Sequence, residues 1–169
     1  MIPRNEVIPA EFYQGYVDLV KDNDFREAIR KNTKLFRRLL ERIPRKKIDY
    51  AYAEGKWTIR QMLQHIIDAE RVFAYRALRL SRKDGTPLPG FDEKQWAVHD
   101  GGAGRKWKDL LEEFKAVRAS TEYLFESMTD DQLRFAGTVN ERPLNAFTIA
   151  FIIPGHVTHH MRILEERYL

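Results

Sequence analysis

The longest helical pattern in the sequence is TIRQMLQHIIDAERVFAYRALRLSR, residues 58–82. Its apolar side chains recur with the 3.6-residue period of an α-helix, and no proline interrupts them. They are Ile59, Met62, Ile66, Ala69, Val72, Phe73, Ala77 and Leu80. Thr58 can cap the first turn with its hydroxyl group. The segment therefore predicts a long core helix that begins near residue 58 and ends near residue 82.

Three other segments have the same helical period, at residues 24–43, 105–128 and 145–168. A short helical turn is expected at residues 131–135, and no segment alternates polar and apolar residues as a half-buried strand does. Residues 84–104 are rich in glycine and proline, which break both helices and strands. The sequence therefore predicts an all-α protein, a four-helix bundle with a long connection between helices two and three.

The length of 169 residues fits a single domain, residues 1–169, with an N-terminal arm at residues 1–23. A short amphipathic helix from Pro9 to Val20 is expected in this arm. There is no cysteine, so any metal ion must be bound by nitrogen and oxygen ligands. No apolar run is long enough to span a membrane, and the first twelve residues lack an apolar signal core. We therefore expect a cytoplasmic protein.

The formal net charge is +4, and the densest basic run lies at the end of the first predicted helix. It consists of Arg37, Arg38, Arg42, Arg45, Lys46 and Lys47. No aromatic residues that could stack on bases are interleaved with these cations. A solvated helix face explains the run better than a nucleic-acid site does, so neither nucleic acid nor a membrane is an expected partner.

Histidines form the most informative cluster, because three of the five lie within residues 156–160. His156 and His160 are four residues apart, which places them on one face of a helix, close to its apolar stripe. His159 falls on the other edge and is interpreted as a rim residue. His65 occupies the inner side of the helix at 58–82. Helical bundles build metal sites from facing helices, so His65, His156 and His160 are the candidate ligands of one divalent metal ion.

Three imidazole ligands leave at least one coordination position for water or substrate, as in a catalytic site. Asp68, one turn after His65, is a candidate second-shell partner that accepts a ring N–H, although a solvated carboxylate is an equal alternative. Trp57 and Phe91 are candidate pocket walls, with packing against the bundle end as the alternative. Arg76 lies on the face of His65 and could bind an anionic substrate, or form a salt bridge to another helix.

The histidine spacing does not match a zinc peptidase signature, because Val157 stands where that class has a glutamate base. The sequence also lacks the serine elbow of hydrolases and the glycine-rich loops that bind nucleotides. Peptide hydrolysis and nucleotide chemistry therefore have no support.

The segments GKWTIRQMLQHIIDAER (residues 55–71) and GHVTHH (residues 155–160) resemble the DinB/YfiT-like superfamily. Residues 71–79, 88–93 and 162–169 resemble one branch of it. The resemblance implies a four-helix bundle of the down-up-up-down type that is often a homodimer. It also implies nickel or zinc bound by one histidine of the second helix and two of the last, which are His65, His156 and His160 here. Related members are thiol-dependent transferases that use bacillithiol or mycothiol.

Two functions fit these observations. The first is a metal-dependent enzyme, a thiol S-transferase or a hydrolase, that acts on a small molecule. In such an enzyme the ion lowers the pKa of a bound water or thiol. The alternative is a non-catalytic, metal-stabilised stress-response or binding protein. The sequence names no catalytic acid or base.

Overall fold

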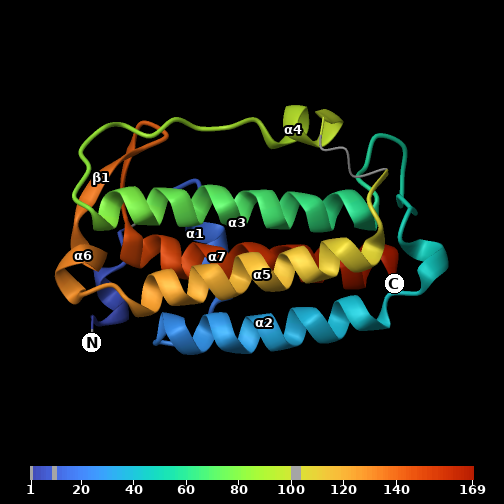
Figure 1. The fold of residues 1–169 in the computed structure, drawn as a ribbon, viewed down its shortest axis with the longest axis horizontal. Coiled ribbons are helices and arrows are strands. Elements are labelled where there is room, and N and C mark those ends of the chain that lie inside the picture. The colour runs from blue at the N-terminus through green and yellow to red at the C-terminus, as the bar shows by residue number, and fades with distance from the viewer. Residues whose placement is uncertain (1, 9–10, 100–103) are drawn as a thin grey trace.

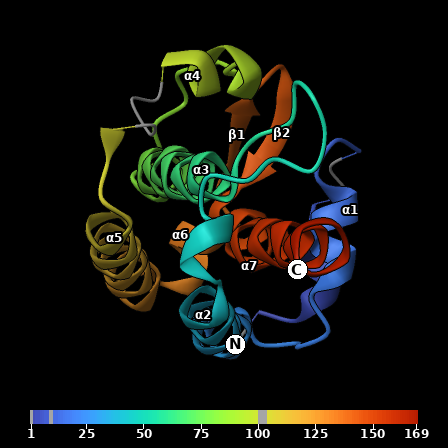
Figure 2. The same ribbon diagram turned by 90° about the vertical axis from the view of Figure 1, so that its right-hand side faces the viewer.

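Four long helices lie side by side in the computed structural model, which describes residues 2–8, 11–99 and 104–169 (Figure 1). They are α2 (Phe25–Arg42), α3 (Ile59–Ser81), α5 (Trp107–Glu126) and α7 (Ala146–Ile163), and a π-helical segment, η4 (Leu164–Tyr168), extends α7. Figure 2 shows the four helices end-on around a common interior. The predicted all-α four-helix bundle is confirmed, and the predicted limits of its four long helices differ from the observed ones by at most two residues when η4 is counted with α7.

Shorter helical elements surround the bundle. They are η1 (Arg4–Glu6), α1 (Gln14–Leu19), η2 (Arg45–Lys47), α4 (Glu93–His99) and α6 (Asp130–Arg134). The α4 helix belongs to the long connection and lies over α3, whereas α1 lies against α7 (Figure 2). Pro9, expected to begin the N-terminal helix, and residues 100–103 of the connection lie outside the described residues.

The expectation that the chain has no strand was wrong. Strands β1 (Ala136–Val139) and β2 (Arg142–Asn145) form an antiparallel hairpin in which Val139 pairs with Arg142. The two residues between them, Asn140 and Glu141, have positive φ angles of 48° and 64°, as tight hairpin turns require. Each strand has only four residues, which is too short for alternating polarity to be recognised in the sequence.

The hairpin fixes the position of the long connection. The Leu88 amide donates a hydrogen bond to the Thr138 carbonyl at 2.9 Å, and the Asn140 amide donates to the Leu88 carbonyl at 2.8 Å. The Leu88 side chain is buried in the core at the same point. These bonds set the place of Pro89 and Phe91, which follow directly.

A glycine allows α1 to approach α7 closely. A Cβ atom at Gly155 would lie 2.0 Å from the backbone oxygen of Tyr16, far inside van der Waals contact. Val17 and Val20 are buried beside this contact. The N-terminal arm is therefore packed onto the last helix next to His156.

A buried polar network crosses the interior between the helices. Arg118 of α5 donates two hydrogen bonds to the carboxylate of Glu70 of α3, at 2.7 and 2.8 Å. It also donates to Thr33 of α2, at 2.8 Å, and to Asn32 Oδ1. Asn32 in turn donates to the carbonyl of Pro154 of α7 at 3.1 Å. One paired cation thus connects all four long helices.

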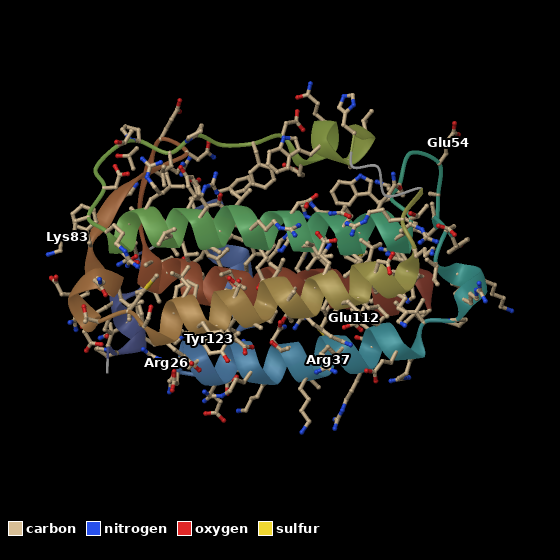
Figure 3. The ribbon with its side chains drawn as sticks, viewed as in Figure 1. Arg26, Arg37, Glu54, Lys83, Glu112 and Tyr123 are labelled. Atoms are coloured by element: carbon tan, nitrogen blue, oxygen red, sulfur yellow. The ribbon has the colours of Figure 1, made fainter. Side chains whose placement is uncertain are left out.

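The basic run of α2 faces outward. Arg37 is exposed and lies beside Glu112 of α5 (Figure 3). Lys115, with smaller contributions from Lys108 and Arg37, lowers the pKa of Glu112. Among the described residues, no helix has both the length and the apolar character that a membrane crossing needs.

Candidate metal centre

Three histidines from two helices converge in the structure. His65 projects from α3, and His156 and His160 project from successive turns of α7. The Nε2 atom of His156 lies 3.1 Å from that of His65 and 3.0 Å from that of His160. Each of the three offers a ring nitrogen, and these nitrogens all lie within 4.8 Å of one another.

This geometry fits one shared cation better than it fits hydrogen bonding. A neutral imidazole nitrogen carries either one proton or one lone pair, so His156 Nε2 can complete only one well-directed hydrogen bond with its two neighbours. Two nitrogens bound to one ion at about 2.1 Å and at tetrahedral or right angles lie about 3.0–3.4 Å apart. The observed separations agree with that range.

The environment keeps the imidazoles neutral, the form that binds metal ions. His156 and His160 are buried, and burial holds the pKa of each well below the ordinary value of histidine. Burial, followed by the charge of His159, lowers the pKa of His65 to about 4. Each ring is therefore neutral at neutral pH and has one nitrogen with a free lone pair that can bind a metal ion.

Aromatic rings orient the histidines. The Trp57 ring centroid lies 4.7 Å from that of His65, and the Tyr16 ring meets His156 edge-on at 5.3 Å. Within the described part of the chain, the Nδ1 atom of His160 is buried without a hydrogen-bond partner. The orientation of the three histidine rings is thus set mainly by packing.

A pocket of about 240 Å³ opens from the histidine cluster. Its lining combines apolar and aromatic side chains with a few polar groups. The lining residues are Phe12, Tyr13, Tyr16, Trp57, His65, Ala69, Phe73, Arg76, Gly90, Phe91, Glu93, Asn140, His156, His159 and His160. Such a mainly apolar cleft with a few convergent polar groups is typical of small-molecule sites.

The structure places three of the four predicted pocket residues in this lining, namely Trp57, Arg76 and Phe91. Asp68 is outside it. There Asp68 accepts a hydrogen bond from Gln64 at 2.9 Å and pairs with Arg71 at 3.5 Å. His159, interpreted as a rim residue, is half-buried at the pocket edge.

Several polar residues of the pocket were missed by the sequence analysis, Glu93 and Tyr16 among them. Glu93, at the start of α4, is the sole carboxylate among the described residues of the lining. Tyr16 of α1 contacts His156 and His159 through its ring. Burial, followed by the charge of Glu93, raises the pKa of Tyr16. No spacing rule connects either residue with the histidines, because they arrive on the connection and the N-terminal arm.

Fold and site together define a four-helix-bundle protein with a three-histidine cluster suited to a divalent metal ion. The chain belongs to the DinB superfamily, whose sequence profile matches residues 28–164. This confirms the family that the two sequence segments around the histidines resemble.

Relatives of known name agree with this class. Two proteins of Oceanobacillus iheyensis are 42% identical over 48 residues and 29% identical over 96 residues, and a Geobacillus kaustophilus protein is 28% identical over 121 residues. All three are provisionally named metal-dependent hydrolases. The alignments cover 28%, 55% and 69% of this chain, and 27%, 55% and 68% of the relatives. The chain thus spans about a quarter and about half of the two Oceanobacillus relatives.

Two solved structures share the fold. YfiT from Bacillus subtilis, a four-helix bundle of unusual topology provisionally described as a metal-dependent hydrolase, superposes with a TM-score of 0.71 at 21% identity. That match covers 98% of this chain and 90% of YfiT. The mycothiol-dependent maleylpyruvate isomerase superposes with a TM-score of 0.69 at 14% identity, covering 96% and 62% of the two chains. At these identities the likeness establishes the fold alone.

Proposed function

We propose that the protein is a metal-dependent hydrolase of a small molecule, with His65, His156 and His160 as the ligands of one divalent ion. The observation that carries the proposal is the convergence of three Nε2 atoms in a pocket, at separations that suit a shared ion. When bound, such an ion lowers the pKa of a coordinated water and so supplies a nucleophile near neutral pH.

The residues of the chain have distinct roles in this proposal. Trp57 and Tyr16 hold the imidazole rings in place and exclude water from one side of each. We assign Glu93 the role of proton acceptor, because it is the carboxylate that the described pocket lining offers.

Thiol transfer is the second candidate. It is favoured by the resemblance to thiol-dependent transferases and by the structural likeness to a mycothiol-dependent isomerase. In that reaction a thiol would take the place of water as the nucleophile, and the same histidines would serve. The nickel or zinc identity of the ion, the homodimer and the cytoplasmic location stay predictions.

Metal analysis of the protein purified without added metal tests the ligand set. We expect about one divalent ion per chain in the native protein and almost none in His156→Ala, because two imidazoles bind a divalent ion far more weakly than three. His159→Ala is the matched control on the same helix and should retain the ion. Full metal content in His156→Ala would refute the proposed site.

Activity assays test the reaction. A panel of small esters, amides and lactones should yield a substrate that the native, metal-loaded protein hydrolyses and His156→Ala does not. Formation of a thioether from bacillithiol or mycothiol and an electrophile, detected by mass spectrometry, would favour the transferase instead. Metal binding without turnover in either panel would favour the non-catalytic alternative.

Replacement of Glu93 tests its assigned role. Glu93→Gln should lower kcat by about 100-fold or more, the usual contribution of a positioned acid or base, while metal content is unchanged. Glu54→Gln is the matched control, since Glu54 is exposed and points away from the bundle (Figure 3). Equal rates for both variants would exclude Glu93 as the proton acceptor.

A further inference from the structure

The same pocket contains a buried, positively charged side chain, that of Arg76. The Arg76 side chain belongs to the pocket lining, yet only 2% of the residue is exposed. Its guanidinium donates to the Tyr13 hydroxyl at 3.2 Å and to the Pro89 carbonyl at 2.7 Å, and it lies 5.8 Å from the centre of the Phe91 ring. Each of these partners is uncharged. Within the described part of the chain, no carboxylate forms an ion pair with Arg76, Glu93 included.

A buried guanidinium without a counter-ion is costly, because the interior solvates the charge poorly. A guanidinium has five N–H donors, and two hydrogen bonds leave the others available for a ligand. An anion that enters the pocket would supply the missing charge. Carboxylates and phosphates match the planar fork of the guanidinium, and the bond is stronger than one between neutral groups.

The placement of Arg76 relative to the histidines defines the shape of such a ligand. His65, Ala69, Phe73 and Arg76 follow one another at helical spacing on α3, and all four line the pocket. Eleven residues of helix separate the Cα atoms of His65 and Arg76 by about 16 Å. Between them the lining of α3 is apolar. The pocket thus has a metal-binding end, an apolar middle and a cationic end.

We propose that this pocket binds an elongated small molecule with a terminal anionic group, which Arg76 holds while the reacting group lies at the three histidines. The proposal rests on the proposed function and adds the chemical class of the substrate. The middle of the molecule is apolar, to match Ala69 and Phe73. The anion is a carboxylate or a phosphate, and synthetic ligands that end in a carboxylate or a phosphonate distinguish the two.

Bifunctional probes test this assignment. A hydroxamate binds metal ions, so alkyl hydroxamates with a carboxylate, phosphonate or carboxamide at the far end measure the cationic end separately. We would titrate the zinc-loaded, full-length protein calorimetrically with a series of chain lengths. At the best length, an anionic tail should bind about tenfold more tightly than the carboxamide tail. A carboxylate or a phosphonate preference identifies the anion.

Variants of Arg76 test whether this residue causes the tighter binding of anionic tails. In Arg76→Met the anionic and carboxamide tails should bind equally, whereas Arg76→Lys should keep part of the preference because it keeps the charge without the fork. Arg79→Met removes the same charge one turn later on α3, outside the pocket lining, and should behave as the native protein.

The outcomes separate this proposal from the proposed function. If no hydroxamate binds the zinc-loaded protein, the open metal site itself is refuted. If all tails bind equally at every chain length, the anion site is refuted while the metal site stands. The native protein alone gives this second answer, so the test does not depend on whether Arg76→Met folds. A preference that persists in Arg76→Met also overturns the assignment.

Discussion

Two arginines are buried almost completely in this protein, and their surroundings differ. Arg118, 1% exposed, donates a bidentate pair of hydrogen bonds to Glu70 and is also bound by Asn32 and Thr33. Arg76, 2% exposed, has a tyrosine hydroxyl and a backbone carbonyl as its partners. Among the described residues, a carboxylate pairs with Arg118 in the bundle interior, and none pairs with Arg76 in the pocket.

The same contrast extends to the neighbours of each arginine. Around Arg118, the polar side chains bond to one another and to the backbone of α7. In the pocket, the three Nε2 atoms converge, and His156 Nε2 can complete a hydrogen bond with only one of its two neighbours. Complete pairing is typical of a network that holds a fold together, whereas incomplete pairing at a cleft is typical of a ligand site. The difference therefore separates structural from functional polar groups.

The largest effect should come from breaking the paired network. Glu70→Gln leaves Arg118 buried without its counter-charge, and we expect it to lower the free energy of unfolding by about 3–5 kcal/mol. Arg76→Met removes a cation that has only neutral partners, so it should cost no more than about 1–2 kcal/mol. Urea denaturation of the metal-free proteins measures both values.

Removal of both charges of the Glu70–Arg118 pair is the control for this prediction. The double variant Glu70→Leu, Arg118→Met removes both charges and should recover much of the lost stability. If Glu70→Gln and Arg76→Met destabilise the protein equally, partner charge does not distinguish the two regions, and the comparison fails.

The two regions also differ in how far the sequence predicts them. The bundle follows from local signals, because the apolar period of α3 and the caps at Asp24 and Thr58 lie within each helix. The three histidines could be identified because helical spacing and the inner face of a bundle are predictable. The family profile then confirmed the resemblance.

The rest of the pocket depends on contacts between distant segments. Glu93 reaches the pocket on a connection that is positioned by hydrogen bonds from Leu88 to an unpredicted hairpin. Tyr16 arrives on an arm that packs closely because Gly155 has no side chain. Neither arrangement has a periodic signature. Asp68, which helical spacing places one turn after His65, lies outside the pocket lining and pairs with Arg71.

Acid should reveal the pocket as the pH-sensitive region. The folded protein holds the pKa of His65 at about 4, below its ordinary value, so the unfolded chain binds the proton more strongly. Stability from this group is complete above pH 6.5 and is lost as the pH falls toward 4. For the metal-free protein, we expect His65 to lower the free energy of unfolding by about 2 kcal/mol between pH 7 and pH 5.

Urea denaturation in a chelating buffer at pH 7, 6 and 5 measures this loss. His156 and His160 add a loss of the same sign, because burial lowers the pKa of both. In His65→Gln the pH dependence should be smaller than in the native protein by the contribution of His65. A metal-free protein equally stable at pH 7 and pH 5 would show that the cluster is not held neutral by its surroundings.

The smallest expected effect concerns the same type of N-terminal cap at two helices, α3 and α6. Thr58 caps α3 and Thr129 caps α6, and each exchanges hydrogen bonds with the glutamine three residues later. Loss of a capping hydroxyl costs about 1 kcal/mol, so Thr58→Ala and Thr129→Ala should destabilise the protein to a similar extent. Thr58 differs because it follows Trp57, whose ring lies against His65 and whose carbonyl accepts a hydrogen bond from Tyr168 at 2.5 Å.

We therefore expect Thr58→Ala to weaken metal binding by up to about tenfold, the lower end of the effects seen for groups that orient metal ligands. Thr129→Ala should leave metal affinity unchanged, because α6 contributes no residue to the pocket lining. Competition with a chelator of known affinity measures both. If the two variants weaken metal binding equally, the histidine cluster responds to overall stability, and the start of α3 has no special role in positioning His65.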